Sequence, residues 1–131
     1  NDARCENYLF SPDGSVTMVD FQYCTRFWGA WDISNWLSAS LDIQDRRNHA
    51  EELVCHYHNE LVANGVQGYS IDQCWFDLKA SLMVQTYNQV IDNDLDYSND
   101  RGNQLLEKCI LRTFSAASDY EIASFIKGVG F

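Results

Sequence analysis

Two short apolar runs stand at the start of the chain, separated by a tetrapeptide that favours a tight turn. The runs cover residues 8–10 and 16–19, and Ser-Pro-Asp-Gly occupies residues 11–14 between them. Proline followed by Asp-Gly is a strong turn signal, and Tyr, Phe and Val suit strands. The pattern therefore predicts a β-hairpin with Asn7 at its entrance and Asp20 at its exit.

Beyond the hairpin, the spacing of apolar residues predicts helices. Residues 46–64 carry apolar side chains at helical spacing and are followed by Gly65, a residue type that often ends a helix. Ser70 and Gln73 have the spacing of a capping box, which would open a helix through residues 75–90.

Two further helices are expected after a polar, acid-rich stretch at residues 92–100. The first covers about residues 103–117, and Ser118 with Glu121 predicts a second capping box and a short helix ending before Gly128. The predicted fold class is α+β and mostly helical, with one small hairpin and four or five packed helices.

The size, composition and net charge of the chain exclude several classes of function. The 131 residues amount to one domain, and 46% hydrophobic and 14% aromatic residues support a core. A net charge of -10 with only nine Lys and Arg argues against nucleic acid and anionic membranes as partners. No stretch approaches the ~20 apolar residues of a membrane span. An acidic chain still binds a polyphosphate when a divalent metal supplies positive charge.

The cysteines and histidines give weaker signals. An odd number of cysteines without a C-x-x-C pair favours buried free thiols in a reducing compartment, so we expect a cytoplasmic protein. His56 and His58 follow Cys55, but positions two apart on a helix diverge by about 200°, so one histidine should face the core and the other solvent. The cysteines are Cys5, Cys24, Cys55, Cys74 and Cys109.

Acidic residues alternate over residues 92–100 as they do in a calcium-binding EF-hand loop. That loop also needs glycine at its sixth position and glutamate at its twelfth, where this chain has Tyr97 and Asn103. A solvated loop between helices is therefore the favoured interpretation.

The four tryptophans are more typical of core residues than of a ligand-stacking cluster, because large aromatic side chains dominate the cores of helical domains. Trp28 and Trp31 follow Asp20 closely and, with Gln22, are the residues expected to border a cleft. The other two are Trp36 and Trp75.

Asp2, Asn7 and Asp20 carry the candidate chemistry. Phosphoryl transfer to a hydroxyl needs a carboxylate near the attacking oxygen and oxygen ligands that hold Mg²⁺ on the nucleotide phosphates. Asp2 suits the first role, and Asn7 and Asp20 suit the second. An Asp-x-x-x-x-Asn pair alone is a weak signal, but the turn-linked runs and Asp-Phe-Gln at residues 20–22 strengthen it. The alternative is a solvated surface hairpin with incidental acids.

These motifs resemble the catalytic loop and metal-binding strand of the aminoglycoside phosphotransferase and choline kinase-like superfamily, and most closely its ecdysteroid kinase-like branch. The family's loop reads His-Gly/Asn-Asp-x-x-x-x-Asn, which Asn1, Asp2 and Asn7 fit. Its second motif, an Asp after apolar residues, fits residues 20–22. Further similarity extends over nearly the whole chain, in a Gly-x-x-Asp at Gly29 and Asp32 and in residues 57–75 and 101–119.

The resemblance implies that Asp2 is the catalytic base, that Asn7 and Asp20 are Mg²⁺ ligands, and that ATP is the phosphoryl donor. It also implies that Asp32 is a buried acid that braces the catalytic loop. We expect Arg4 to touch the transferred phosphate. An ordinary pairing of Arg4 with Glu6 or another acid is equally open.

By the same resemblance, residues 1–131 correspond to the catalytic and substrate-binding C-terminal lobe of a kinase-like enzyme, with the family's histidine just before Asn1. A lobe with a phosphate-covering loop and a Lys–Glu pair is needed to hold ATP, and the chain contains no glycine cluster that replaces it. We therefore expect the N-terminal lobe to be absent and the isolated fragment to catalyse little.

The predicted function is ATP-dependent phosphorylation of a hydroxyl group on a small molecule, with that molecule and the nucleotide as partners. Acidic helices would favour a neutral or cationic acceptor. The alternative is a non-catalytic helical binding or scaffold module of kinase-like fold. The presence of Asp2, Asn7 and Asp20 together tells against it, because a scaffold has no physical need for all three.

Overall fold

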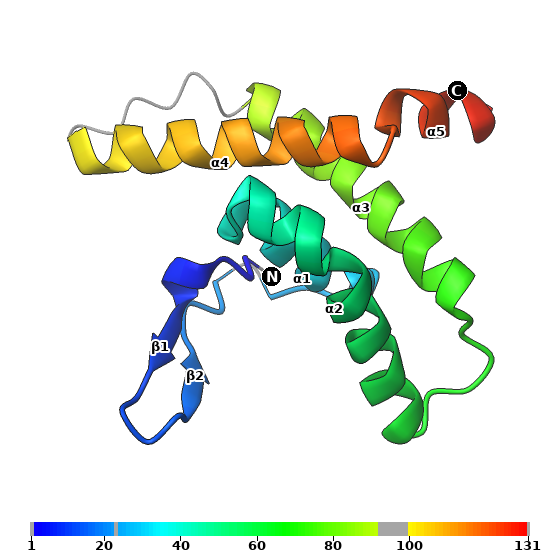
Figure 1. Ribbon diagram of the computed structural model, residues 1–131, viewed down its shortest axis with the longest axis horizontal. Helices are drawn as coiled ribbons and strands as arrows, with labels where there is room; N and C mark the ends of the chain where they lie inside the picture. Colours follow the sequence, from blue (N-terminus) through cyan, green and yellow to red (C-terminus); the bar gives the residue numbers. More distant parts are fainter. Residues whose placement is uncertain (1, 23, 92–99, 131) are drawn as a thin grey trace.

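The computed structural model describes residues 2–22, 24–91 and 100–130, which form one two-stranded hairpin and five α-helices (Figure 1). The α+β, mostly helical class is confirmed, whereas the alternating acids at 92–99 lie outside the described residues. The elements in chain order are the 3-10 turn η1 (Cys5–Asn7), strands β1 (Tyr8–Phe10) and β2 (Val16–Met18), helix α1 (Ala30–Asn35), the π-helical turn η2 (Trp36–Ser40), and helices α2 (Ile43–Ala63), α3 (Ile71–Ile91), α4 (Asp100–Asp119) and α5 (Ile122–Gly128).

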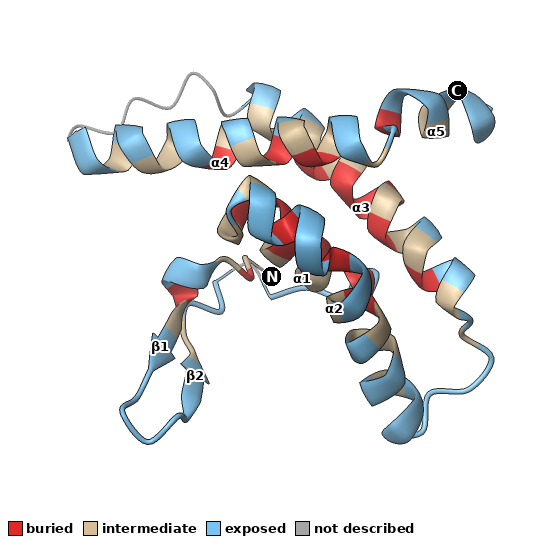
Figure 2. Cartoon of the chain, in the orientation of Figure 1, coloured by how far each residue is buried: buried red, intermediate tan, exposed pale blue. Residues whose placement is uncertain are grey.

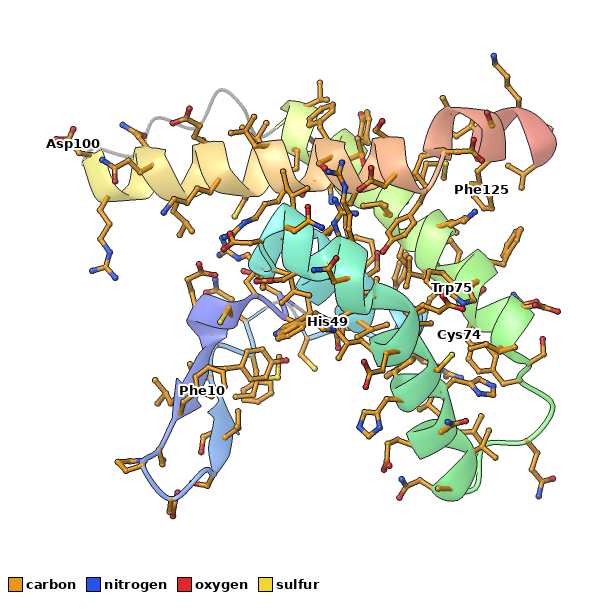
Figure 3. All side chains as sticks on the ribbon, in the orientation of Figure 1. Phe10, His49, Cys74, Trp75, Asp100 and Phe125 are labelled. Carbon is orange, nitrogen blue, oxygen red and sulfur yellow. The ribbon has the colours of Figure 1, made fainter. Side chains whose placement is uncertain are left out.

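The predicted hairpin is confirmed. β1 and β2 are antiparallel with Tyr8 opposite Met18, and the turn has Gly14 at a φ of 84°, which suits glycine. The Asp13 carboxylate accepts the backbone N–H of Ser15 at 3.0 Å and so closes the turn. The strands extend away from the helices, and Phe10 is 64% exposed near their tip (Figures 1 and 3). The turn η1 at the entrance of the hairpin contacts the helical body, where the Cys5 backbone N–H donates to the Ser40 hydroxyl at 2.8 Å.

The core lies where α3 crosses the other helices, and Figure 2 shows the buried positions concentrated there. One cluster joins α1, η2, α2 and the first half of α3, with Leu37, Val54 and Leu78 fully buried. A second joins α3, α4 and α5 through Leu82, Ala116 and Ile122. Burial of each leucine contributes about 1.5–3 kcal/mol. Trp36 and Trp75 pack against the first cluster, as expected of core tryptophans.

Helix α2 ends where the sequence predicts. The backbone N–H of Gly65 donates to the Val62 carbonyl and that of Val66 to the Leu61 carbonyl, both at 3.0 Å. This pair of bonds is a Schellman motif, which requires the left-handed φ of 94° that Gly65 adopts.

Of the two predicted capping boxes, one forms in part and the other is wrong. The Ser70 hydroxyl accepts the backbone N–H of Gln73 at 3.1 Å, although the Gln73 side chain donates to Asp77 rather than closing the box. Helix α5 begins at Ile122, with Glu121 as its N-cap at a φ of 54° and no side-chain cap. Burial of Ile122 in the second cluster fixes this start, so Ser118 remains in α4.

Alanine at Ser70 and at Ser118 should therefore have different effects. Ser70→Ala removes a capping bond and is expected to lower the free energy of unfolding by about 1 kcal/mol. Ser118→Ala should change it by less than about 0.5 kcal/mol, because no helix start depends on this hydroxyl. Urea unfolding measures both, and an equal loss in the two variants would contradict the observed start of α5.

The cysteines only partly follow the sequence-based expectation. All five are free thiols, but Cys5 and Cys24 are exposed, because they lie in η1 and in the loop after the hairpin rather than against the helices. Cys74 and Cys109 are buried. Within the described part of the chain, none of the helices has the length and apolar character needed to cross a bilayer.

Candidate active site

The short turn η1 places Asn7 beside Asp2. Asn7 is 8% exposed, and its side-chain amide nitrogen donates to the Asp2 carbonyl at 2.7 Å and approaches the Asp2 carboxylate at 3.4 Å. The backbone N–H of Val19 donates to the Asn7 carbonyl at 2.8 Å, which ties this segment to the end of β2. Asp20 follows Val19 directly, so the two predicted metal ligands, Asn7 and Asp20, lie at the same end of the hairpin.

Asp20 has a φ of 61°, in the left-handed region that aspartate tolerates better than most residues. This turn ends the β2 segment and leaves Asp20 exposed at the wall of a cavity. Asp20 and Asp2 both line that cavity, which has a volume of about 1040 Å³. Two of the three residues predicted to carry the chemistry thus face the same space, and the third is bonded to Asp2.

Arg4 forms an ion pair with Asp2. Its Nε lies 2.9 and 3.1 Å from the two carboxylate oxygens of Asp2, and its Nη2 lies 2.9 Å from Oδ2. Burial acts to lower the pKa of Arg4, but the charge and hydrogen bonds of Asp2 outweigh burial and raise it overall. The acid that pairs with Arg4 is therefore the predicted base itself rather than Glu6.

Sequence reasoning missed Asn35, whose side-chain nitrogen lies 3.3 Å from Asp2 Oδ1. Asn35 is the last residue of α1, a helix that is fastened to α3 by the buried Gln85. Gln85 donates to the Trp31 carbonyl at 3.1 Å and accepts the Ser34 hydroxyl at 3.1 Å and the Ser38 hydroxyl at 3.3 Å. The sequence does contain a signal for this site, because Ser34, Asn35 and Ser38 are polar residues that stand among apolar ones.

The remaining wall of the cavity is neutral. Among the described lining residues, no charged side chain comes from α3 or α4, so this wall does not itself favour a cationic acceptor. Gln22 and Trp31 are part of the lining, whereas Trp28 is 45% exposed and packs against Phe27. The lining includes the amides Asn35, Gln85, Asn88 and Gln89 and the apolar residues Phe27, Trp31, Ile91, Leu105 and Leu106.

Asp32 lies on α1 between the hairpin and α2. Burial, and then the negative charge of Asp32, raise the pKa of Tyr8 on β1 and contribute to the raised pKa of Tyr57 on α2. Gly29 allows the Tyr57 hydroxyl to lie close to the start of α1, since a Cβ at Gly29 would lie 3.1 Å from that hydroxyl. Asp32 is thus near the strand that follows Asn7, and its bracing role stays a prediction.

The donor set at the hairpin end fits Mg²⁺. The side-chain nitrogen of Asn7 is bonded to Asp2, so the Oδ1 atom of Asn7 is the one that could bind a cation. The Asp20 carboxylate supplies a second oxygen ligand. Within residues 2–22, 24–91 and 100–130, no three His, Cys, Asp or Glu side chains gather as a metal site. His58 bonds the Tyr69 carbonyl at 2.8 Å while His56 is exposed, as expected for two histidines at this spacing.

Comparison with known proteins gives one match. The model of the ecdysteroid kinase-like family matches residues 1–66, which include Asp2, Asn7, Asp20 and Asp32. No match was found among curated proteins or among solved structures. The matched segment therefore contains the catalytic-loop and metal-strand motifs, whereas the similarity expected at residues 67–75 and 101–119 lies outside it.

Proposed function

The chain belongs to the ecdysteroid kinase-like family, and from this membership we propose that it is an ATP-dependent phosphotransferase acting on a hydroxyl group of a small molecule. The observation that carries the proposal is the shared cavity. Asp2 and Asp20 are distant in sequence but line one space, and Asn7 is bonded to Asp2. This arrangement supports the proposal, because phosphoryl transfer requires a base close to the residues that hold the metal.

In this proposal, Asp2 orients the acceptor hydroxyl and receives its proton as the oxygen attacks the γ-phosphorus of ATP, whose bond to the bridging oxygen breaks to release ADP. Asn7 Oδ1 and the Asp20 carboxylate would hold Mg²⁺, which would neutralise charge on the nucleotide phosphates. The ring and aliphatic side chains of Trp31, Leu105 and Leu106 exclude water from the acceptor. The amides of the neutral wall bind further oxygen atoms of an uncharged acceptor.

Arg4 has a distinct role in the proposal. Its ion pair covers both oxygens of the carboxylate that must accept the proton, so this contact has to be released before reaction. Phosphate oxygens are strong acceptors for a guanidinium and carry more charge than one carboxylate. We therefore assign Arg4 to Asp2 in the nucleotide-free protein and to the transferred phosphate in the complex.

The alternative function is a non-catalytic binding module that keeps the fold. The polar contacts around Asp2 weigh against it, because a cavity used only for packing gains nothing from two donors on the Asp2 carboxylate and a third on its backbone carbonyl. The five free thiols fit a reducing compartment, and we propose the cytoplasm.

The decisive test compares Asp20→Asn with the wild type in full-length protein. We expect Mg²⁺-dependent transfer of label from γ-labelled ATP to a neutral alcohol, and a loss of about 10- to 100-fold in the variant because one charged ligand is removed. Excess Mg²⁺ should recover part of the activity. Asp13→Asn is the matched control, since this acid lies in the hairpin turn and should leave transfer unchanged.

Two results would overturn the proposal. One is wild-type protein that binds Mg-nucleotide but transfers phosphate to none of a broad panel of alcohols, which would favour the binding module. The other is equal activity in Asp20→Asn and Asp13→Asn, which would remove Asp20 from the metal site.

A further inference from the structure

The Asp2 carboxylate is held from two directions. Arg4 binds it from within the same short segment, two residues away, and covers both oxygens. Asn35 reaches it from α1, 33 residues away, and contacts only Oδ1 at 3.3 Å. Asn7 makes its short bond to the Asp2 backbone carbonyl, so it fixes the segment more than the carboxylate.

These donors differ in whether they can remain during proton transfer. A guanidinium bound to both oxygens stabilises the ionised carboxylate and occupies the lone pairs that a proton would take. A neutral amide on Oδ1 leaves on Oδ2 the long 3.4 Å approach of the Asn7 amide nitrogen, so this oxygen can still receive the acceptor hydroxyl. Once Arg4 has moved, Asn35 is the side chain on α1 that still fixes the direction of the carboxylate.

The position of Asn35 is set by contacts between helices rather than by the segment that carries Asp2 and Arg4. Its neighbours Ser34 and Ser38 are 1% and 2% exposed and both donate to Gln85 on α3. Gln85 is itself 6% exposed and bonds the Trp31 carbonyl one turn earlier. Asn35 is therefore presented by a helix segment bonded to α3 on both sides, which suits a group that must hold another side chain within a fraction of an ångström.

We propose that Asn35 is the positioning residue of Asp2: its side-chain amide holds Oδ1 so that Oδ2 faces the acceptor hydroxyl. The proposal rests on the proposed phosphotransferase function. It assigns a function to a polar residue that the motif pattern does not include.

The test uses full-length Asn35→Ala, with Asn59→Ala as the matched control because Asn59 is an exposed asparagine on α2. We expect kcat to fall about 10-fold in Asn35→Ala, with the KM for ATP within about 2-fold of wild type. Asn35→Gln, which retains the amide, should recover part of kcat.

A measurement independent of activity separates this inference from the proposed function. The NMR signal of the Asn35 side-chain amide should shift in Asp2→Asn and stay unchanged in Asp72→Asn, an exposed acid on α3. If the Asn35 amide signal shifts in Asp2→Asn but the wild-type protein has no transferase activity, the contact between Asn35 and Asp2 is supported and the proposed function is refuted. An active enzyme whose Asn35→Ala variant keeps a normal kcat would refute the positioning role, as would an unshifted amide signal.

Discussion

Replacement of Asp2 by asparagine is expected to lower the turnover of the full-length protein by at least ~100-fold, the usual scale for removal of a positioned base. Asparagine has nearly the shape of aspartate and keeps contacts with Asn7 and Asn35, but it does not accept a proton from the acceptor hydroxyl. The KM for ATP should not rise, because in the proposal Asp2 contacts the acceptor rather than the nucleotide, and loss of its charge leaves Arg4 available for the transferred phosphate. Steady-state kinetics at saturating acceptor separates the two quantities.

Asp72→Asn serves as the control for loss of one negative charge in this acidic protein. Asp72 is exposed in the first turn of α3 and lies outside the cavity lining. Turnover in Asp72→Asn should match the wild type. Near-normal turnover in Asp2→Asn would mean that Asp2 is not the base, whatever the role of the cavity.

Much of the fold follows from local sequence because the signals themselves are local. The turn residues Pro12, Asp13 and Gly14 determine the hairpin within a few positions, and Gly65 ends α2 through bonds to the preceding turn. The start of α5 was not predictable in this way. Ser118 and Glu121 satisfy a local capping pattern, but packing of Ile122 in the core decides where the helix begins.

The candidate site was likewise predictable from the sequence where its contacts are local and not predictable where they depend on helix packing. The motif spacing identified Asp2, Asn7 and Asp20, and the short segment that joins them explains why they meet at the hairpin end. The contact from Asn35 spans 33 residues and depends on how α1 is rotated against α3, which periodicity does not specify. The Arg4 contact is local, but the sequence alone did not decide between phosphate and carboxylate as its partner.

The largest expected effect on stability comes from a second polar cluster, between α2 and α4. Arg46 is 1% exposed, and its guanidinium donates to Asp119 Oδ2 at 2.9 Å and to the Ser115 hydroxyl at 2.9 Å. Arg47 binds the same carboxylate from the surface, at 2.8 and 3.0 Å. Asp119 is therefore the counter-charge of a buried cation, and its loss leaves Arg46 with the Ser115 hydroxyl but without a carboxylate.

Asp119→Asn should lower the free energy of unfolding by about 2–3 kcal/mol. Loss of one partner from a fully buried pair costs about 3–5 kcal/mol, and the smaller value applies because the Asp119 side chain is 25% exposed. The melting temperature should fall by roughly 10 °C for a domain of this size. Arg47→Ala is the control, since Arg47 is half exposed and its loss should cost less than about 1 kcal/mol.

The effect should also depend on pH in a defined direction. Hydrogen bonds from Arg47 are the largest cause that lowers the pKa of Asp119 from its usual value of 3.8; burial opposes them, and Arg46 adds to the lowering. The folded protein therefore binds the Asp119 proton less readily than the unfolded chain, so this stability is present above about pH 4 and is lost as pH falls through the lowered pKa. Urea unfolding of wild type and Asp119→Asn should show a difference that is constant from about pH 5 to 7 and shrinks below about pH 4. A difference that grows on acidification would contradict the lowered pKa of Asp119. A larger loss in Arg47→Ala than in Asp119→Asn would show that the surface arginine rather than buried Arg46 determines the contribution of Asp119.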